Sequence, residues 1–190
     1  MKERFEKILD FARPYLNTRR NDIHTDISRE FARELVKREG GDEDIVMPAI
    51  ILHDVGWKKV PPELQLKAFG PKAKSPELNR IHEEEGVKIA GKILRKVAYD
   101  EKSIQEILVI IDGHDSRKEA VSLNDQIVKD ADKLFRYSRT GWCIDVERFG
   151  MTPEEELTRL RSHLGKWFFT DTAKKLAEKE LKSRIMESGI

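Results

Sequence analysis

Hydrophobic residues recur along this chain mostly three or four positions apart, and stretches that alternate apolar and polar residues are almost absent. We therefore predict an all-α fold. The pattern places helices near residues 2–16, 22–38, 43–56, 76–98, 101–114, 123–138 and 153–186. Thr152 and Pro153, followed by three glutamates, are a strong start signal for the last helix. Residues 61–76, rich in proline and lysine, predict a long polar loop.

The predicted helix at 43–56 carries the most informative pair of residues. It is apolar on every side from Ile45 to Leu52, which is typical of a helix buried in the middle of a protein, and it then reaches His53 and Asp54. A carboxylate buried there without a partner costs several kcal/mol. A divalent cation offsets that cost, because imidazole and carboxylate are both metal ligands. The simpler alternative is a buried hydrogen bond between His53 and Asp54.

Composition narrows the class of protein. A chain of 190 residues is one domain, or one domain with a helical extension. Its 36 basic and 35 acidic residues nearly cancel, so no overall positive field exists to hold nucleic acid or an anionic membrane. The single cysteine, Cys143, excludes an intrachain disulfide. Without an apolar signal region or a membrane-spanning stretch, we expect a cytoplasmic protein with no nucleic-acid or membrane partner.

Two further histidines are predicted to point inward. His24 shares the apolar face of its helix with Ile27, and His114 continues the stripe of Ile107 and Ile111. A lone histidine on an apolar stripe is more often a satisfied core residue than a ligand. Two of them beside a buried His–Asp pair favour a shared metal, because one ion satisfies all of these groups at once.

Periodicity does not place every candidate residue. His82 lies at the edge of the apolar face of its helix, between a core and a surface position, whereas His163 lies among charged residues and is predicted to be on the surface. Asp130 and Asp132 flank the apolar face of the helix at 123–138 on opposite sides, by about 100° each. Helical spacing therefore does not decide which aspartate faces a site.

The spaced set of His24, the pair His53-Asp54, and Asp132 between Ala131 and Lys133 resembles the HD-domain metal-dependent phosphohydrolase superfamily. The resemblance covers roughly residues 20–138. It implies that Asp132 is the distal metal ligand, with Asp130 as the fallback. We therefore expect an HD metal-binding domain over 1–138 and a C-terminal helical extension over 139–190 packed on the same domain.

The remaining histidines resemble those of binuclear members of this superfamily. His82 stands four residues before Gly86, in their His-x-x-x-Gly context, and His114 supplies the other. The set is similar to that of the bacterial dinucleoside tetraphosphate hydrolases. Cyclic-dinucleotide phosphodiesterases share it too, but they usually carry a lysine where Trp57 stands and a Gly-Tyr-Pro signature that this chain lacks. The implied metal ligands are His24, His53, Asp54, His82, His114 and Asp132.

This resemblance implies hydrolysis of a phosphoester or phosphoanhydride of a small molecule, with a nucleotide favoured, by a metal-activated water. Asp54 would bridge two ions, or a single ion would occupy part of the set. Nitrogen and oxygen ligands without a thiolate suit iron, manganese, nickel, cobalt or zinc. Two alternatives remain: a metal-binding regulatory HD module without turnover, and a di-iron oxygenase. The charged helix at 153–186 could dock a partner or a second subunit in a homodimer.

Further charged residues are candidates for substrate binding and proton transfer. Substrate phosphates need fixed cations, and the candidates are Arg20, Lys58, Lys133 and Arg136. Of these, the resemblance favours Lys133. Beside Asp54, we expect Asp115 and Glu83 to act as a general base or to orient a histidine. Glu83 is equally well explained as a first-turn acid that complements the dipole of its helix.

Overall fold

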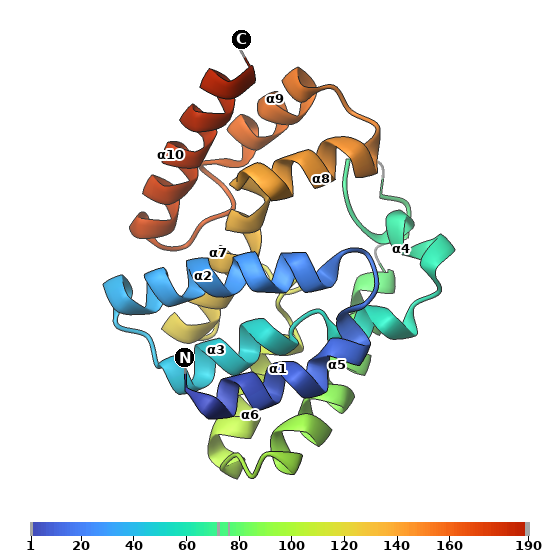
Figure 1. The fold of residues 1–190 in the computed structure, drawn as a ribbon, viewed down its shortest axis with the longest axis vertical. Helices are drawn as coiled ribbons and strands as arrows, with labels where there is room; N and C mark the ends of the chain where they lie inside the picture. Colours follow the sequence, from blue (N-terminus) through green and yellow to red (C-terminus); the bar gives the residue numbers. More distant parts are fainter. Residues whose placement is uncertain (1, 72, 76, 189–190) are drawn as a thin grey trace.

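The structure is a computed structural model that describes residues 2–71, 73–75 and 77–188. In this part of the chain it consists of ten α-helices and one short 3-10 helix, with no strand, which confirms the all-α prediction (Figure 1). The helices are α1 (Glu3–Leu16), α2 (Asn21–Glu39), α3 (Glu43–Leu52), η1 (Val55–Lys59), α4 (Pro62–Ala68), α5 (Glu77–Lys96), α6 (Glu101–Ile111), α7 (Leu123–Tyr137), α8 (Arg139–Phe149), α9 (Pro153–His163) and α10 (Asp171–Ser188).

The hydrophobic helix α3 occupies the centre of the fold. Every residue from Ile45 to Leu52 is buried, as the uniformly apolar sequence predicts. It packs against α1, α2, α6 and α7, while α5 packs against η1 and α6. Asp42 begins α3 by accepting a hydrogen bond from the backbone N–H of Asp44. Helices α1, α2, α6 and α7 thus surround α3.

The C-terminal helices cover one end of this bundle. In Figure 1, α8, α9 and α10 form the upper part of the molecule, above α2. Helix α10 packs against α7 and α2, and α8 packs against α7. Leu157, Leu160, Ala177 and Leu181 belong to the same buried cluster as α3. The hydrophobic core is therefore continuous from the N-terminal helices into the C-terminal ones.

Several predicted helix boundaries are confirmed and two are wrong. The helices predicted at 2–16, 22–38, 101–114 and 123–138 correspond to α1, α2, α6 and α7, and the one at 76–98 corresponds to α5, although residue 76 lies outside the described residues. The helix predicted at 43–56 ends at Leu52, and a 3-10 helix follows. The helix predicted at 153–186 is interrupted after His163 and becomes α9 and α10.

The interruption between α9 and α10 is explained by a contact with α7. Thr152 and Glu155 form the capping box that begins α9, which confirms the predicted start. After His163, however, the backbone N–H groups of Phe169 and Thr170 donate to the buried carboxylate of Asp130 in α7. These bonds hold the chain away from helical geometry until α10 begins at Asp171.

Two further helices were missed. Helix α4 lies inside the predicted loop at 61–76, of which residues 72 and 76 are outside the described part, and Pro62 stands in its first turn. Helix α8 follows α7 almost directly: the Ser138 side chain accepts a bond from the backbone of Gly141, and Gly150 ends the helix at a φ of 61°. Both helices are short, and neither carries a long apolar stripe.

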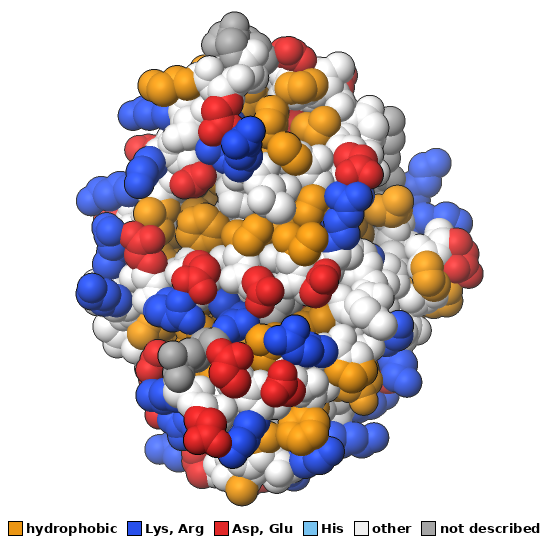
Figure 2. Space-filling view, in the orientation of Figure 1, with side chains coloured by type: hydrophobic (Ala, Val, Ile, Leu, Met, Phe, Trp, Pro, Cys, Tyr) orange, Lys and Arg blue, Asp and Glu red, His pale blue; other side chains and the backbone are white. Residues whose placement is uncertain are grey.

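The surface agrees with the balanced composition. On the face shown in Figure 2, basic and acidic side chains are interspersed, without a large area of one sign. No helix in the described ranges has the length and apolar character needed to cross a membrane.

Candidate metal centre

Seven ionisable residues from five parts of the chain lie close together. His24 lies in the first turns of α2, His53 and Asp54 follow α3, and His82 lies in α5. His114 and Asp115 follow α6, and Asp132 lies in α7. All but Asp115 are buried, and His53 and His82 are fully buried. The structure therefore places all six predicted metal ligands at one point, with Asp115 beside them.

Two histidines are held by the same device. The Nδ1 atoms of His53 and His114 lie 2.8 and 2.9 Å from the backbone carbonyls of Ile50 and Ile111, three residues earlier in each case. A carbonyl only accepts hydrogen bonds, so Nδ1 carries the proton and donates it. In the neutral ring, Nε2 is then left with a free lone pair that faces the centre, as in a metal-binding histidine.

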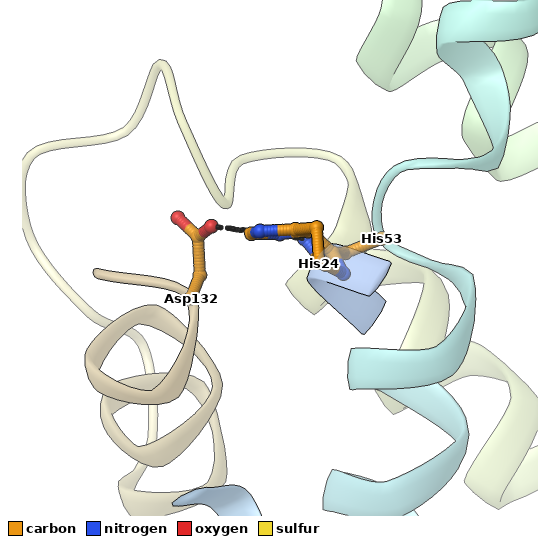
Figure 3. A group of neighbouring side chains, drawn as sticks. All are labelled: His24, His53 and Asp132. Carbon is orange, nitrogen blue, oxygen red and sulfur yellow. Dashed lines mark hydrogen bonds and ion pairs between the residues drawn. The ribbon is translucent and has the colours of Figure 1, made fainter. Parts of the chain in front are cut away.

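The ligands form two groups. In the first, His24 Nε2 lies 3.0 Å from His53 Nε2 and 3.3 Å from Asp132 Oδ1, and Figure 3 shows the Asp132 carboxylate directed at these two imidazoles. In the second, His82 Nε2 lies 3.2 Å from His114 Nε2 and 3.7 Å from Asp115 Oδ2. Each group brings three ligand atoms close enough to surround one ion.

Asp54 lies between the two groups. Its Oδ2 is 3.7 Å from His24 Nε2, and its Oδ1 is 3.8 Å from His53 Nε2 and 3.6 Å from His114 Nε2. One carboxylate thus faces ligands of both groups through two oxygens. This is the geometry that a bridging ligand requires.

The donor set fits divalent metal ions. Nε2 atoms that face each other at 3.0 and 3.2 Å need a cation or a shared proton between them. Burial lowers the pKa of His82 to about 4. Burial acts in the same direction on His114, but the nearby carboxylates of Asp54 and Asp115 raise its pKa to about 9. Without metal, the second pair thus combines a neutral ring with a protonated one, and an ion would replace that proton.

Trp57, which the sequence analysis treated only as a departure from a subfamily pattern, contacts the centre. Its Nε1–H donates to Asp54 Oδ1 at 3.1 Å, and its ring stacks on His82 with centroids 4.0 Å apart. Trp57 is almost completely buried. It therefore orients one ligand of each kind, a carboxylate and an imidazole.

Glycine is required where η1 crosses α5. A Cβ added to Gly56 would lie 2.8 Å from the carbonyl carbon of His82 and 2.5 Å from the backbone nitrogen of Gly86. The backbone of η1 can pack this closely against α5 only because Gly56 lacks a side chain, whereas a Cβ at Gly86 would make ordinary contacts, the nearest at 3.4 Å. This close contact sets the distance between His82 and the other ligands.

Glu83 has a positioning role in the structure. It is fully buried, and its carboxylate accepts hydrogen bonds from the backbone of Asp115 and Ser116, from the Ser116 hydroxyl and from Arg80. Four donors occupy its oxygens, so it is poorly suited to accept a proton from a substrate water. It fixes the segment after α6, which carries His114 and Asp115.

Asp130 and Asp132 have separate tasks. Asp132 belongs to the first ligand group, whereas Asp130 is fully buried on another side of α7 and accepts three hydrogen bonds from Phe169 and Thr170. Asp130 is therefore a structural link to the C-terminal helices. The structure brings Asp132, and not the fallback residue, to the centre.

The centre opens into a small cavity of about 70 Å³. Its lining includes His24, Asp54, Asp115 and Asp132 from the ligand groups and three arginines, Arg19, Arg136 and Arg148. Of the four predicted substrate-binding cations, Arg136 lines this cavity and Lys133 contacts its acids, with Nζ 3.0 Å from Asp115 and 2.5 Å from Asp132.

The other two predicted cations lie elsewhere. Arg20 is exposed and pairs with Glu147 at 2.8 Å, and exposed Lys58 donates to Asn17 at 2.7 Å. Sequence reasoning missed Arg19 and Arg148. Arg19 is next to the predicted Arg20, and only the backbone turn decides which of the two points inward. His163, half-buried and stacked on Trp167, is also remote from the centre.

The structure is an all-α bundle with a cluster of four histidines and three aspartates, all but Asp115 buried, whose side chains could hold metal ions. The HD domain family matches residues 22–137, more than half of the chain, and the chain belongs to this family. A crystal structure described as a predicted HD superfamily hydrolase from an uncultured Thermotogales bacterium has the same fold. It is 22% identical, with a TM-score of 0.65, covering 97% of this chain and 88% of that one. No curated protein matches this chain.

Proposed function

We propose that this HD-domain protein is a metal-dependent phosphohydrolase that acts on a small phosphorylated molecule, with a nucleotide as the favoured class. The observation that carries the proposal is the position of Asp54 between two groups of ligands. Divalent ions held there would polarise a phosphoryl oxygen and lower the pKa of a water that attacks phosphorus. The ligands would be His24, His53 and Asp132 for one ion and His82 and His114 for the other, with Asp54 shared.

The protein's own residues prepare the site for this reaction. Trp57 and the carbonyls of Ile50 and Ile111 hold the ligands in place, so little reorganisation is needed when substrate binds. Lys133 lies between Asp115 and Asp132 and partly neutralises two carboxylates that would otherwise repel a phosphate. Of the aspartates Asp54, Asp115 and Asp132, Asp115 is the most exposed, with a quarter of its side chain accessible to solvent. A proton released by the attacking water would leave through its carboxylate.

A substrate screen combined with metal analysis tests the proposal. Phosphomonoesters, nucleotides and dinucleotides should be offered with Mn²⁺, Fe²⁺ or Ni²⁺, and turnover should require the metal. Asp54→Ala should abolish hydrolysis and most of the bound metal while the circular dichroism spectrum stays helical. Asp10→Ala, an exposed acid on α1, is the matched control and should change neither. Full activity in Asp54→Ala would refute the mechanism, and metal binding without any turnover would instead support a regulatory module.

A further inference from the structure

Three arginines meet in the cavity beside the metal centre. The guanidinium carbons of Arg19, Arg136 and Arg148 lie 4.0, 6.0 and 5.6 Å from the centre of the Phe69 ring, and all three side chains line the cavity. They come from the turn before α2, from α7 and from α8. The fold thus gathers positive charge from distant parts of the sequence at one place.

Two buried acids hold other members of this cluster. Asp145 is fully buried and accepts from Arg136 at 2.5 Å, from Arg148 at 3.2 Å and from Arg159 at 3.4 Å. Arg159 also pairs with the buried Glu156. The carboxylates of Asp54, Asp115 and Asp132 line the same cavity, and bound metal ions would offset their charge. The unpaired donors of Arg19 would then be left for an anionic ligand.

Arg19 is the arginine whose charge is least compensated. Its Nε and Nη1 atoms are buried and have no hydrogen-bond partner among the described residues. Its guanidinium group lies between the rings of Trp57 and Phe69, at 3.9 and 4.0 Å. Burial lowers its pKa from 12.5 to about 10, which shows that the charged form is disfavoured there. A half-buried cation whose buried donors are unused is suited to an anionic ligand.

The backbone holds Arg19 in this position at some cost. Arg19 and Arg20 have φ values of 55° and 60°, a left-handed conformation that residues other than glycine rarely adopt. The Arg19 carbonyl accepts a hydrogen bond from Arg148 Nη2 at 2.7 Å, which joins two members of the cluster. Local strain that the surrounding structure maintains is characteristic of functional positions. The turn points Arg19 inward, while Arg20 stays exposed with Glu147.

We infer that Arg19, supported by Arg136 and Arg148, forms an anion subsite for a second phosphoryl group, so that the substrate contains at least two linked phosphoryl groups. A guanidinium fork binds phosphate oxygens in pairs, which suits this cluster. Arg19 and Arg148 line both the cavity of about 70 Å³ and a larger neighbouring hollow of about 310 Å³. A linked phosphate chain could extend along these shared residues. The substrate class rests on the proposed hydrolase function, but anion binding does not.

Calorimetric titration of the full chain tests the subsite. After metal removal with EDTA and dialysis, inorganic pyrophosphate should bind at least about 10-fold more tightly than orthophosphate at the same ionic strength. Arg19→Gln should weaken pyrophosphate binding about 10- to 100-fold, because it removes charge-assisted hydrogen bonds. Arg38→Gln is the matched control, because Arg38 is an exposed arginine near the end of α2 that lines neither hollow, and it should stay within about twofold of the wild type. Arg19→Lys, which keeps the charge but loses the fork, should lie between them.

These outcomes distinguish failure of the anion subsite from failure of the proposed hydrolase function. Equal losses in Arg19→Gln and Arg38→Gln, or no preference for pyrophosphate over orthophosphate, would overturn the subsite. A thermal melt confirms folding of each variant, and Arg19→Lys still decides if Arg19→Gln fails to fold. With metal restored, Arg19→Gln should lower kcat/KM for a nucleoside diphosphate more than for the corresponding monophosphate. If neither is hydrolysed while the binding difference persists, the proposed hydrolase function fails and the subsite stands.

Discussion

Replacement of Gly56 by alanine should damage stability and the metal centre together. The new Cβ would lie 2.5 Å from the Gly86 nitrogen, and real Cβ atoms essentially never approach closer than 3.0 Å. The Gly86 nitrogen alone requires the crossing of η1 and α5 to widen by 0.5 Å, the difference between these two distances, and the His82 carbonyl oxygen, which would lie closer still, requires more. The neighbours are backbone atoms, which cannot rotate away. We therefore expect a cost near the upper end of overpacking effects, about 3 kcal/mol.

This free energy converts into measurable changes. For a domain of this size, about 2–4 °C of melting temperature is lost per kcal/mol, so Gly56→Ala should melt roughly 6–12 °C below the wild type. The melt should be followed by circular dichroism in EDTA, so that metal binding does not contribute. Metal–ligand distances tolerate only about 0.2 Å, so the His82 side of the centre should lose its ion. A misplacement of this kind lowers kcat/KM by about 100-fold.

Gly165→Ala is the matched control for this substitution. A Cβ at Gly165 would meet no atom within 4 Å, and its φ is not in the left-handed region. This variant should match the wild type in melting temperature and in metal content, measured by elemental analysis. If Gly56→Ala also matched the wild type in both, the close crossing of η1 and α5 would not set the geometry of the centre, and the reasoning would be refuted.

Three further perturbations test other parts of the structure. Chelation should lower the melting temperature of metal-loaded protein by about 5–11 °C, because saturation at about 100 times Kd contributes about 2.7 kcal/mol, and an unchanged melt would contradict a buried metal site. Glu83→Gln should cost about 1–3 kcal/mol in denaturant unfolding and reduce metal content, since it frees the segment that carries His114. Asp130→Ala should cost a similar amount, because the N–H groups of Phe169 and Thr170 lose their acceptor, yet it should retain all of the metal; loss of an ion would make Asp130 a ligand.

Much of the centre could be predicted because its residues follow helical periodicity or adjacent pairing. His24 and His114 were placed inward by the spacing of their apolar neighbours, and His53-Asp54 by the hydrophobic segment before them. Asp130 and Asp132 could not be separated by spacing, because both flank the same helix face. Their roles depend on Thr170, forty residues away, which binds only Asp130.

The misses have equally specific causes. Arg19 and Arg20 are adjacent and chemically identical, and the left-handed turn that separates them leaves no helical or strand pattern. The break after His163 depends on the same Asp130 carboxylate. The sequence did carry local signals of this break: Gly165 is a helix-ending residue, and the Thr170-Asp171 pair is a typical helix start. Short polar helices such as α8 are stabilised by packing and caps more than by an apolar stripe.

His53 and His114 are each fastened by a backbone carbonyl at the end of a helix, and this bears on which ion the protein selects. Side-chain ligands that can swing adjust to any ion, and affinity then follows the intrinsic order of the divalent metals, with copper highest. Rings tied to the Ile50 and Ile111 carbonyls cannot swing, so the ends of α3 and α6 determine the width of the gap between ligands. The protein can then select among metal ions by how well each ion fits this gap. The peptide groups of Ile50 and Ile111, which no substitution of their own side chains changes, would thus determine how far the metal preference departs from the intrinsic order.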